Sequence, residues 1–132
     1  MLTNEERDAL VKYRIEKACG TLIEARDCAD DHHWTLAANR LYYAAYYASK
    51  ALLIQNGIIA KSHEGVIGMI GQQFVVPGII SKEEAKLLAR LQNMRMTGDY
   101  DDFIEWHQEE VEPLFEMVGK YIDKIKSLVN LN

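Results

Sequence analysis

The segment from Trp34 to Asn56 constrains the fold more than any other part of the chain. It places alanine, leucine, isoleucine and tyrosine on nearly every side of a helix, and Gly57 follows it as a typical helix-ending residue. A helix that is apolar almost all round must be covered on more than one side. We therefore expect it at the centre of a bundle, where a second copy of the chain can cover the face that its own helices leave open.

The flanking sequence predicts further helices around this central one. Apolar residues recur at three- and four-residue steps over Asn4–Asp30, where Thr3 or Asn4 caps the helix, and again from about Gln108 onward. Shorter helices are expected over His63–Phe74 and after Ser81, which begins a capping box. The sequence contains only two prolines, and it shows no linker and no internal repeat. The sequence predicts one domain spanning all 132 residues, an all-α, antiparallel, up-and-down helical bundle of four to five helices.

Charge is distributed unevenly along the sequence. The net charge of −5, from 15 basic and 20 acidic residues, argues against a protein whose whole surface grips nucleic acid. Residues 39–100 nevertheless carry 7 basic and 4 acidic side chains, a net +3, whereas residues 1–38 carry −3 and residues 101–132 carry −5. We expect an anionic ligand to bind the middle segment. The alternative is that the acidic outer helices are simply solvated.

The cysteines, the histidines and the first residues of the chain indicate the cellular compartment and whether a metal or cofactor is expected. Cys19 and Cys28 lie nine residues apart, on opposite sides of one helix, so no disulfide between them is expected. The first residues lack the apolar core of a signal peptide, and no apolar run approaches the roughly 20 residues that a bilayer requires. The spacing of His32 and His33 fits no standard metal site. We expect a cytoplasmic protein without membrane contact, metal or cofactor.

Three stretches resemble the HEPN family of prokaryotic helical proteins, in that family's order along the chain. They are Asn-Arg-Leu-Tyr-Tyr-Ala-Ala-Tyr-Tyr-Ala-Ser-Lys-Ala-Leu-Leu from Asn39, Lys-Ser-His-Glu-Gly-Val from Lys61, and Arg-Met-Thr-Gly-Asp-Tyr from Arg95. The resemblance implies a dimeric bundle, often encoded beside a minimal nucleotidyltransferase as a toxin–antitoxin pair. It also implies, for many members, a metal-independent RNase whose motif is an arginine followed after four to six residues by a histidine.

This sequence departs from that motif. Arg95 fits its first position, but Tyr100 stands where the histidine is expected. In the chemistry that the resemblance implies, the histidine takes a proton from a ribose hydroxyl and the arginine stabilises charge on the phosphate. A tyrosine, with an ordinary pKa of about 10, is a poor base at neutral pH. The catalytic candidates are therefore Arg95 and, in place of the missing histidine, His63.

A ligand site is expected around these candidates. Arg40, within an apolar helix, needs either an acidic partner such as Asp99 or an anionic ligand. Tyr43 suits the core, a dimer interface or a base-stacking platform. His63 can cap the helix that it begins or hold a phosphate. Arg95 can pair with an acid or neutralise the end of its helix. The predicted ligand-binding residues are Arg40, Tyr43, His63, Arg95, Asp99 and Tyr100.

Three functions are compatible with the sequence. The first is a non-enzymatic or weakly active homodimer that binds a nucleotidyltransferase, an RNA or a nucleotide near Arg40, His63 and Arg95. The second is an RNase toxin that uses Arg95 and His63. The third is a structural interaction module without a ligand. Complex formation without RNA cleavage favours the first, and cleavage that is lost on Arg95→Ala favours the second.

Overall fold

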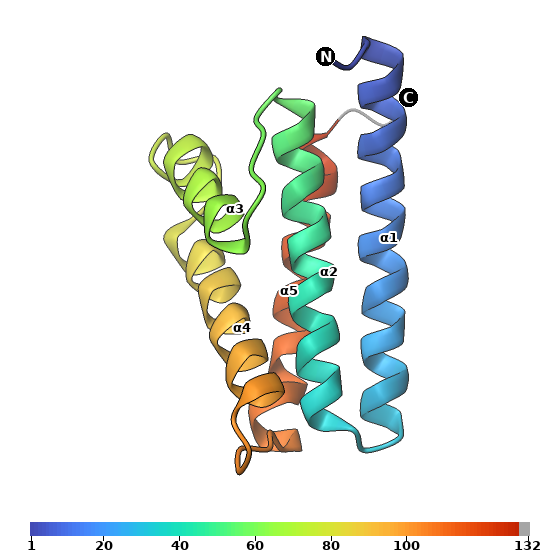
Figure 1. The fold of residues 1–132 in the computed structure, drawn as a ribbon, viewed down its shortest axis with the longest axis vertical. Helices are drawn as coiled ribbons and strands as arrows, with labels where there is room; N and C mark the ends of the chain where they lie inside the picture. Colours follow the sequence, from blue (N-terminus) through green and yellow to red (C-terminus); the bar gives the residue numbers. More distant parts are fainter. Residues whose placement is uncertain (130–132) are drawn as a thin grey trace.

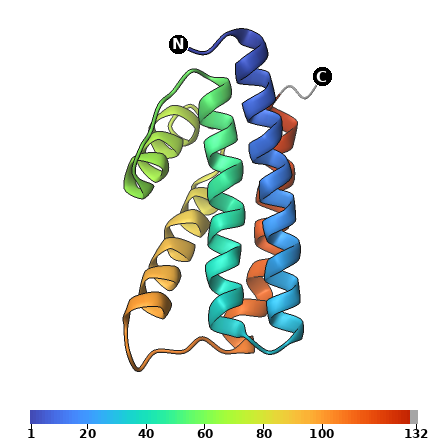
Figure 2. The same ribbon diagram turned by 45° about the vertical axis from the view of Figure 1, so that its right-hand side comes forward.

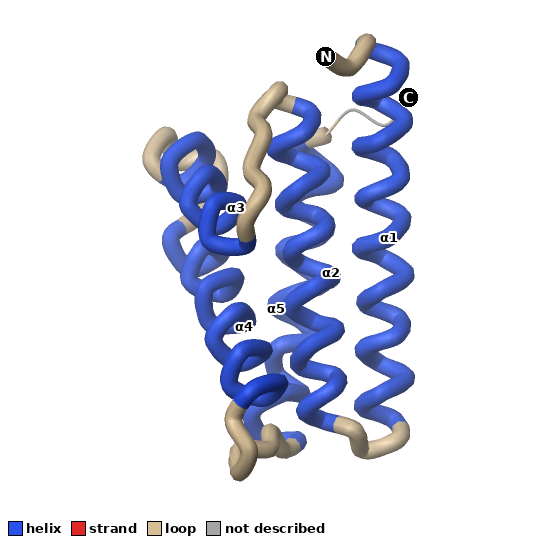
Figure 3. The backbone as a smooth tube through the Cα atoms, in the orientation of Figure 1, coloured by secondary structure: helices blue, strands red, loops and turns tan. Residues whose placement is uncertain are grey.

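The structure is a computed structural model that describes residues 1–129, and every regular element in that range is a helix (Figures 1 and 3). The element order contains four long helices and a short one between the second and third of them. The long helices alternate in direction (Figure 1). The predicted all-α antiparallel bundle is confirmed. The elements are α1 (Asn4–Asp30), α2 (Trp34–Gln55), α3 (His63–Ile70), the π-helical turn η1 (Gly71–Val75), α4 (Lys82–Tyr100) and α5 (Gln108–Leu128).

α2 is the central helix, as its composition predicts. It packs against α1, α3, α4 and α5, with α1 on one side, α3 and α4 on the other, and α5 behind it (Figures 1 and 2). Alanines at positions 37, 38, 44, 45, 48 and 51 are fully buried. Because these side chains are small, neighbouring helices can lie close to the α2 backbone. One face stays partly open, since Arg40, Tyr43 and Tyr47 are only partly buried and Leu36 is 51% exposed.

The helix ends follow local rules that can be read from the sequence. The Thr3 hydroxyl accepts the backbone N–H of Glu6, and the Glu6 carboxylate accepts that of Thr3. Ser81 and Glu84 form the same capping box at the start of α4. α2 ends before Gly57, whose φ of 73° lies in the left-handed region that favours glycine.

Two helices differ from expectation at their C-terminal ends. The helix that begins at His63 changes to a π-helical turn at Gly71, where the Val76 N–H bonds the Gly71 carbonyl at 3.0 Å. α4 continues through Gly98 to Tyr100, although a glycine ordinarily weakens a helix interior. Gly98 instead makes room for a neighbour, because a Cβ there would lie 3.1 Å from the indole nitrogen of Trp106.

Trp106 fixes the connection between α4 and α5. Its backbone N–H donates to the Thr35 hydroxyl, and its indole N–H donates to the Met94 carbonyl, both at 2.9 Å. Residues 101–105, just before it, are all exposed. The loop therefore has a fixed base and a solvent-facing tip. Within residues 1–129, no helix is both long and apolar enough to cross a membrane.

Candidate functional site

The centre of the candidate site is a contact between α2 and the first residue of α3. The Tyr42 hydroxyl lies 2.6 Å from Nδ1 of His63. The His63 ring stacks on Tyr46, with 4.6 Å between centroids and 26° between planes. The Ser62 hydroxyl, not His63, caps α3 by accepting the N–H of Gly65. The cap that was considered for His63 is therefore made by its neighbour, and the imidazole is free to pack on the tyrosines.

Arg95 reaches the same tyrosines from α4. Its guanidinium carbon lies 5.2 Å from the Tyr42 ring centroid and 5.6 Å from that of Tyr43, which is cation–π distance. The side chain is buried, yet its charge is weakly compensated. Asp99 lies 3.8 Å away, Gln92 accepts one bond at 3.3 Å, and the buried Nε has no hydrogen-bond partner among the described residues. A buried guanidinium with a free donor is suited to an anionic ligand.

Arg40 does not form the predicted ion pair with Asp99. Its guanidinium donates twice to the side-chain oxygen of Asn39, at 2.9 and 3.0 Å, and the Asn39 amide donates to Asp99 at 2.9 Å. Asn39 thus links Arg40 to Asp99. Asp99 also faces Arg95 on its own helix. In the described part of the chain, no carboxylate lies within salt-bridge distance of Arg40, whose guanidinium carbon lies 5.1 Å from the Tyr43 ring centroid.

Further cations from α1 and α2 surround these rings. The Lys17 ammonium lies 4.8 Å from the Tyr47 ring centroid, and the Lys50 ammonium lies 5.6 Å from that of Tyr46. Arg14 acts electrostatically on both Tyr46 and Lys50. We call this surface the aromatic–cationic face. It consists of Tyr42, Tyr43, Tyr46, Tyr47 and His63 with Arg14, Lys17, Arg40, Lys50 and Arg95.

The environment of this face keeps His63 neutral and Tyr42 protonated. Burial lowers the pKa of His63, and the positive charge of Arg95 lowers it further, against a smaller opposing effect of Glu64. Burial raises the pKa of Tyr42 well above its ordinary value. A neutral imidazole has one donor and one acceptor nitrogen. If Nδ1 carries the proton and donates to the Tyr42 oxygen, Nε2 is left as an acceptor that can take a proton from a substrate.

The structure brings most of the predicted ligand residues together. Arg40, Tyr43, His63 and Arg95 belong to the aromatic–cationic face, and Asp99 is joined to it through Asn39 and Arg95. Tyr100 is separate. It is 71% exposed, and its side chain makes no hydrogen bond or ring contact with any described residue.

Sequence reasoning missed Tyr42 and Tyr46, the tyrosines that hold His63, and the cations Arg14, Lys17 and Lys50. The spacing of Tyr42 and Tyr46, four residues apart, could have placed them on one face of the helix. No pattern in the sequence brings Arg14 and Lys17 to that face, because they belong to the acidic N-terminal segment. Their position depends on how α1 packs against α2.

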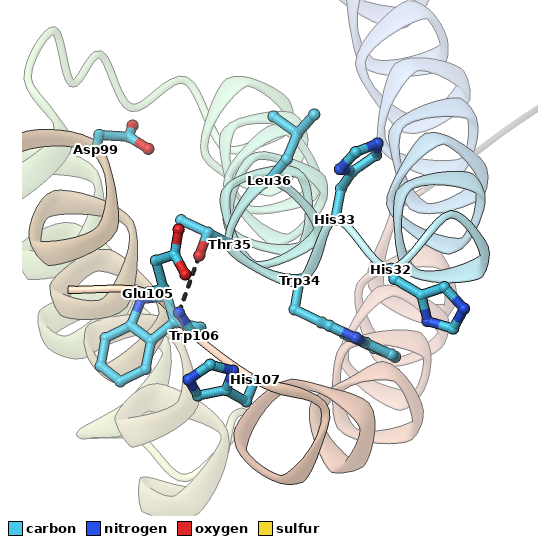
Figure 4. Close-up of a pocket in the computed structure, with 9 residues that line it drawn as sticks. All are labelled: His32, His33, Trp34, Thr35, Leu36, Asp99, Glu105, Trp106 and His107. Carbon is cyan, nitrogen blue, oxygen red and sulfur yellow. Dashed lines mark hydrogen bonds between the residues drawn. The ribbon is translucent and has the colours of Figure 1, made fainter. Parts of the chain in front are cut away.

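A cavity at the N-terminal end of α2 is lined by several potential metal ligands (Figure 4). Figure 4 shows the imidazoles of His32, His33 and His107 separated around it, with Asp99 on a further side and the hydrogen bond between Thr35 and Trp106 at one wall. No group of three His, Cys, Asp or Glu residues within residues 1–129 is placed to hold a metal ion. The cavity is therefore not a candidate metal centre.

Comparison with known proteins gives consistent similarities. The family model described as HEPN domain matches residues 11–128. A UPF0332 protein of Thermotoga maritima is 30% identical over 124 residues, 94% of each chain. Two proteins of Methanocaldococcus jannaschii are named as candidate toxins. One is 32% identical over 112 residues, covering 85% of this chain and 76% of its own, and the other is 30% identical over 125 residues, covering 95% and 92%.

Proposed function

Because the chain belongs to the HEPN domain family, we propose that it is a toxin–antitoxin-type HEPN protein. In this proposal it forms a homodimer, pairs with a minimal nucleotidyltransferase, and binds RNA or a nucleotide at the aromatic–cationic face. The relatives named as candidate toxins support the toxin–antitoxin assignment. The pairing with a nucleotidyltransferase rests on the resemblance of the Asn39, Lys61 and Arg95 stretches to the family.

The observation that carries ligand binding is the weakly compensated charge of Arg95 beside an aromatic surface. Within the described residues, Arg95 has one carboxylate at 3.8 Å and an unpaired Nε, and a phosphate that approaches its guanidinium compensates this charge. The rings of Tyr43 and Tyr47 are partly exposed and can stack on bases. Of the five cations on this face, only Arg95 has a carboxylate of a described residue within salt-bridge distance, and the excess positive charge attracts a polyanion although the whole chain carries −5.

Dimer formation is supported by the open face of α2. Leu36, Tyr43 and Tyr47 leave apolar and aromatic surface accessible on the helix that is otherwise the core of the bundle. Burial of such surface against a second copy removes apolar area from water. A two-fold dimer through this face joins two aromatic–cationic faces into one larger cleft.

An RNase activity is the second candidate, and one specific observation favours it. Arg95 and His63, the two catalytic candidates, both contact Tyr42 although they lie on different helices. Neutral His63 suits a general base for a ribose hydroxyl, and Arg95 suits the charge that develops on the attacked phosphate. In this mechanism Tyr42 is a positioning residue: its hydroxyl accepts the Nδ1–H of His63, which leaves Nε2 as the base.

Two measurements on the purified protein separate the candidates. Incubation of a mixed RNA pool in EDTA tests cleavage, with Arg95→Ala and His63→Gln as site variants and exposed Arg90→Ala as the matched control. Cleavage by the wild type and Arg90→Ala alone establishes the RNase. Without cleavage, co-purification with a nucleotidyltransferase encoded beside it supports the partner role. A folded monomer that neither cleaves RNA nor binds RNA, nucleotide or such an enzyme contradicts the proposal.

A further inference from the structure

An apolar groove lies where α2 ends, against the start of α1 and the connection to α3. Its apolar side chains include Leu10, Ile54 and Ile58, and its charged side chains are Arg14, Lys50 and Lys61. Among the residues that the structure describes, no carboxylate lines it. We call it the cationic groove. Ile59 also lines it and is 82% exposed, so apolar surface of the groove is open to solvent.

The cations of this groove lack counter-charges in the described part of the chain. The Nε of Arg14 is buried and has no hydrogen-bond partner within residues 1–129. Burial lowers the pKa of Lys50, and the positive charge of Arg14 adds to that effect. Two like charges that are partly desolvated together are unfavourable unless an anion joins them. The groove is therefore complementary to a partner that carries both carboxylates and apolar side chains.

The chain itself carries such a segment in residues 101–105, Asp-Asp-Phe-Ile-Glu, which we call the acidic loop. Phe103 is 98% exposed and Ile104 is 41% exposed. None of its three carboxylates forms an ion pair with a described residue. The Trp106 anchor holds the base of the loop. Three carboxylates flanking two apolar side chains match the three cations and apolar floor of the cationic groove.

The two features cannot meet within one chain. The acidic loop follows α4 at the end of the bundle where α2 begins (Figures 1 and 2). The groove is lined by residues at the other end of α2 and just after it. The length of α2 separates them, about 30 Å at the usual helical rise. A two-fold axis across the middle of α2, near Tyr43 and Tyr47, exchanges the ends of two copies. It brings the loop of each copy to the groove of the other.

We propose that the acidic loop of one copy docks in the cationic groove of a second copy, so that an antiparallel two-fold dimer contains two identical loop–groove contacts. Phe103 fills the apolar floor, and the loop carboxylates face Arg14, Lys50 and Lys61. The inference rests on the proposed homodimer and names the surface that forms it. It also explains why a phenylalanine is kept almost fully exposed in the isolated chain.

Intermolecular disulfide formation tests the contact directly. In a background with Cys19→Ser and Cys28→Ser, one protein carries Phe103→Cys and another carries Ile59→Cys. Mixing them under a mild oxidant is expected to give a disulfide between the two different proteins, and neither protein alone gives comparable dimer. Val76→Cys is the matched control, because Val76 is 83% exposed, close to the 82% of Ile59, but lies outside the groove. It is expected not to cross-link to Phe103→Cys.

Sedimentation equilibrium on the same background separates this inference from the proposed homodimer. Phe103→Ser is expected to raise the dimer dissociation constant by about tenfold or more, as for a central interface aromatic, and added salt to weaken the wild-type dimer. A stable dimer without the specific cross-link overturns the loop–groove contact and leaves the homodimer standing. A monomer at all concentrations overturns both. Loss of RNA-oligonucleotide binding on Lys61→Glu, a groove residue outside the aromatic–cationic face, without any cross-link, assigns the groove to nucleic acid and also overturns the inference.

Discussion

The Tyr42 hydroxyl lies 2.6 Å from Nδ1 of His63, and this contact ties the central helix to the first residue of α3. Tyr42→Phe keeps the ring and removes only the hydroxyl. We expect the free energy of unfolding to fall by about 1 kcal/mol, the usual net value of one hydrogen bond. Urea denaturation measures this loss. Tyr13→Phe is the control, because the Tyr13 hydroxyl is not hydrogen-bonded to any described residue and its ring is 52% exposed. Equal losses in both variants would mean that the contact contributes nothing specific.

The stability of the protein should depend on pH through His63. Burial, with Arg95 as a second cause, lowers the pKa of His63 in the folded state. The unfolded chain, with an ordinary histidine pKa of about 6.5, therefore takes up a proton before the folded protein does. The contribution is fully present above that pH and is lost as the pH falls below it. Thermal unfolding across this range should show a slope that His63→Gln reduces. If His63→Gln retains the full slope, another group causes the pH dependence. His33→Gln, at an exposed histidine, is the control for loss of an imidazole.

A buried hydroxyl pair joins α2 to α5. The Ser49 hydroxyl donates to the Ala45 carbonyl at 2.8 Å, so its oxygen accepts from the Tyr121 hydroxyl at 2.6 Å. Ser49→Ala leaves a buried donor unpaired and should cost about 1–3 kcal/mol, whereas Tyr121→Phe should cost about 1 kcal/mol. The double variant should cost less than the sum of the two. Additive losses in urea denaturation would contradict this coupling.

Two glycines in helices should respond oppositely to alanine. At Gly98 a Cβ would lie 2.9 Å from the Thr35 methyl and 3.1 Å from the Trp106 indole nitrogen, whereas at Gly119 it meets nothing within 4 Å. Gly119→Ala should raise the free energy of unfolding by roughly 0.5–1 kcal/mol through helix propensity. Gly98→Ala should lower it and shift the tryptophan fluorescence, because Trp106 must move. A stabilising Gly98→Ala would show that this packing is not tight.

The fold could be predicted because its signals are local. The predicted helix over Asn4–Asp30 has those same ends, and the capping box at Ser81 forms as expected. These features depend on spacing of three and four residues, which the sequence displays directly. The close packing at Gly98 could not be predicted, because its neighbours Thr35 and Trp106 lie outside α4 and local spacing does not reveal them.

The site could be predicted only in part, because its contacts depend on how helices rotate and pack. Arg40, His63 and Arg95 were found from their residue types and the family resemblance. Arg40 does not pair with Asp99, because the Asn39 side chain bonds to both of them. Whether Asn39 or Arg40 reaches Asp99 depends on how α2 packs against α4.

The RNA affinity of the Arg95→Ala variant tests most directly whether the aromatic–cationic face binds the ligand. Fluorescence anisotropy with a labelled single-stranded RNA compares the wild type, Arg95→Ala and Arg90→Ala, all shown to be folded by circular dichroism. If the aromatic–cationic face holds the ligand, Arg95→Ala should weaken binding by about tenfold or more, as expected for a charge-assisted phosphate contact. Arg90→Ala, which removes an exposed arginine of the same helix, should change binding only slightly. Equal affinities for wild type and Arg95→Ala, or no binding by the wild type, would contradict the assignment of this face as the ligand site.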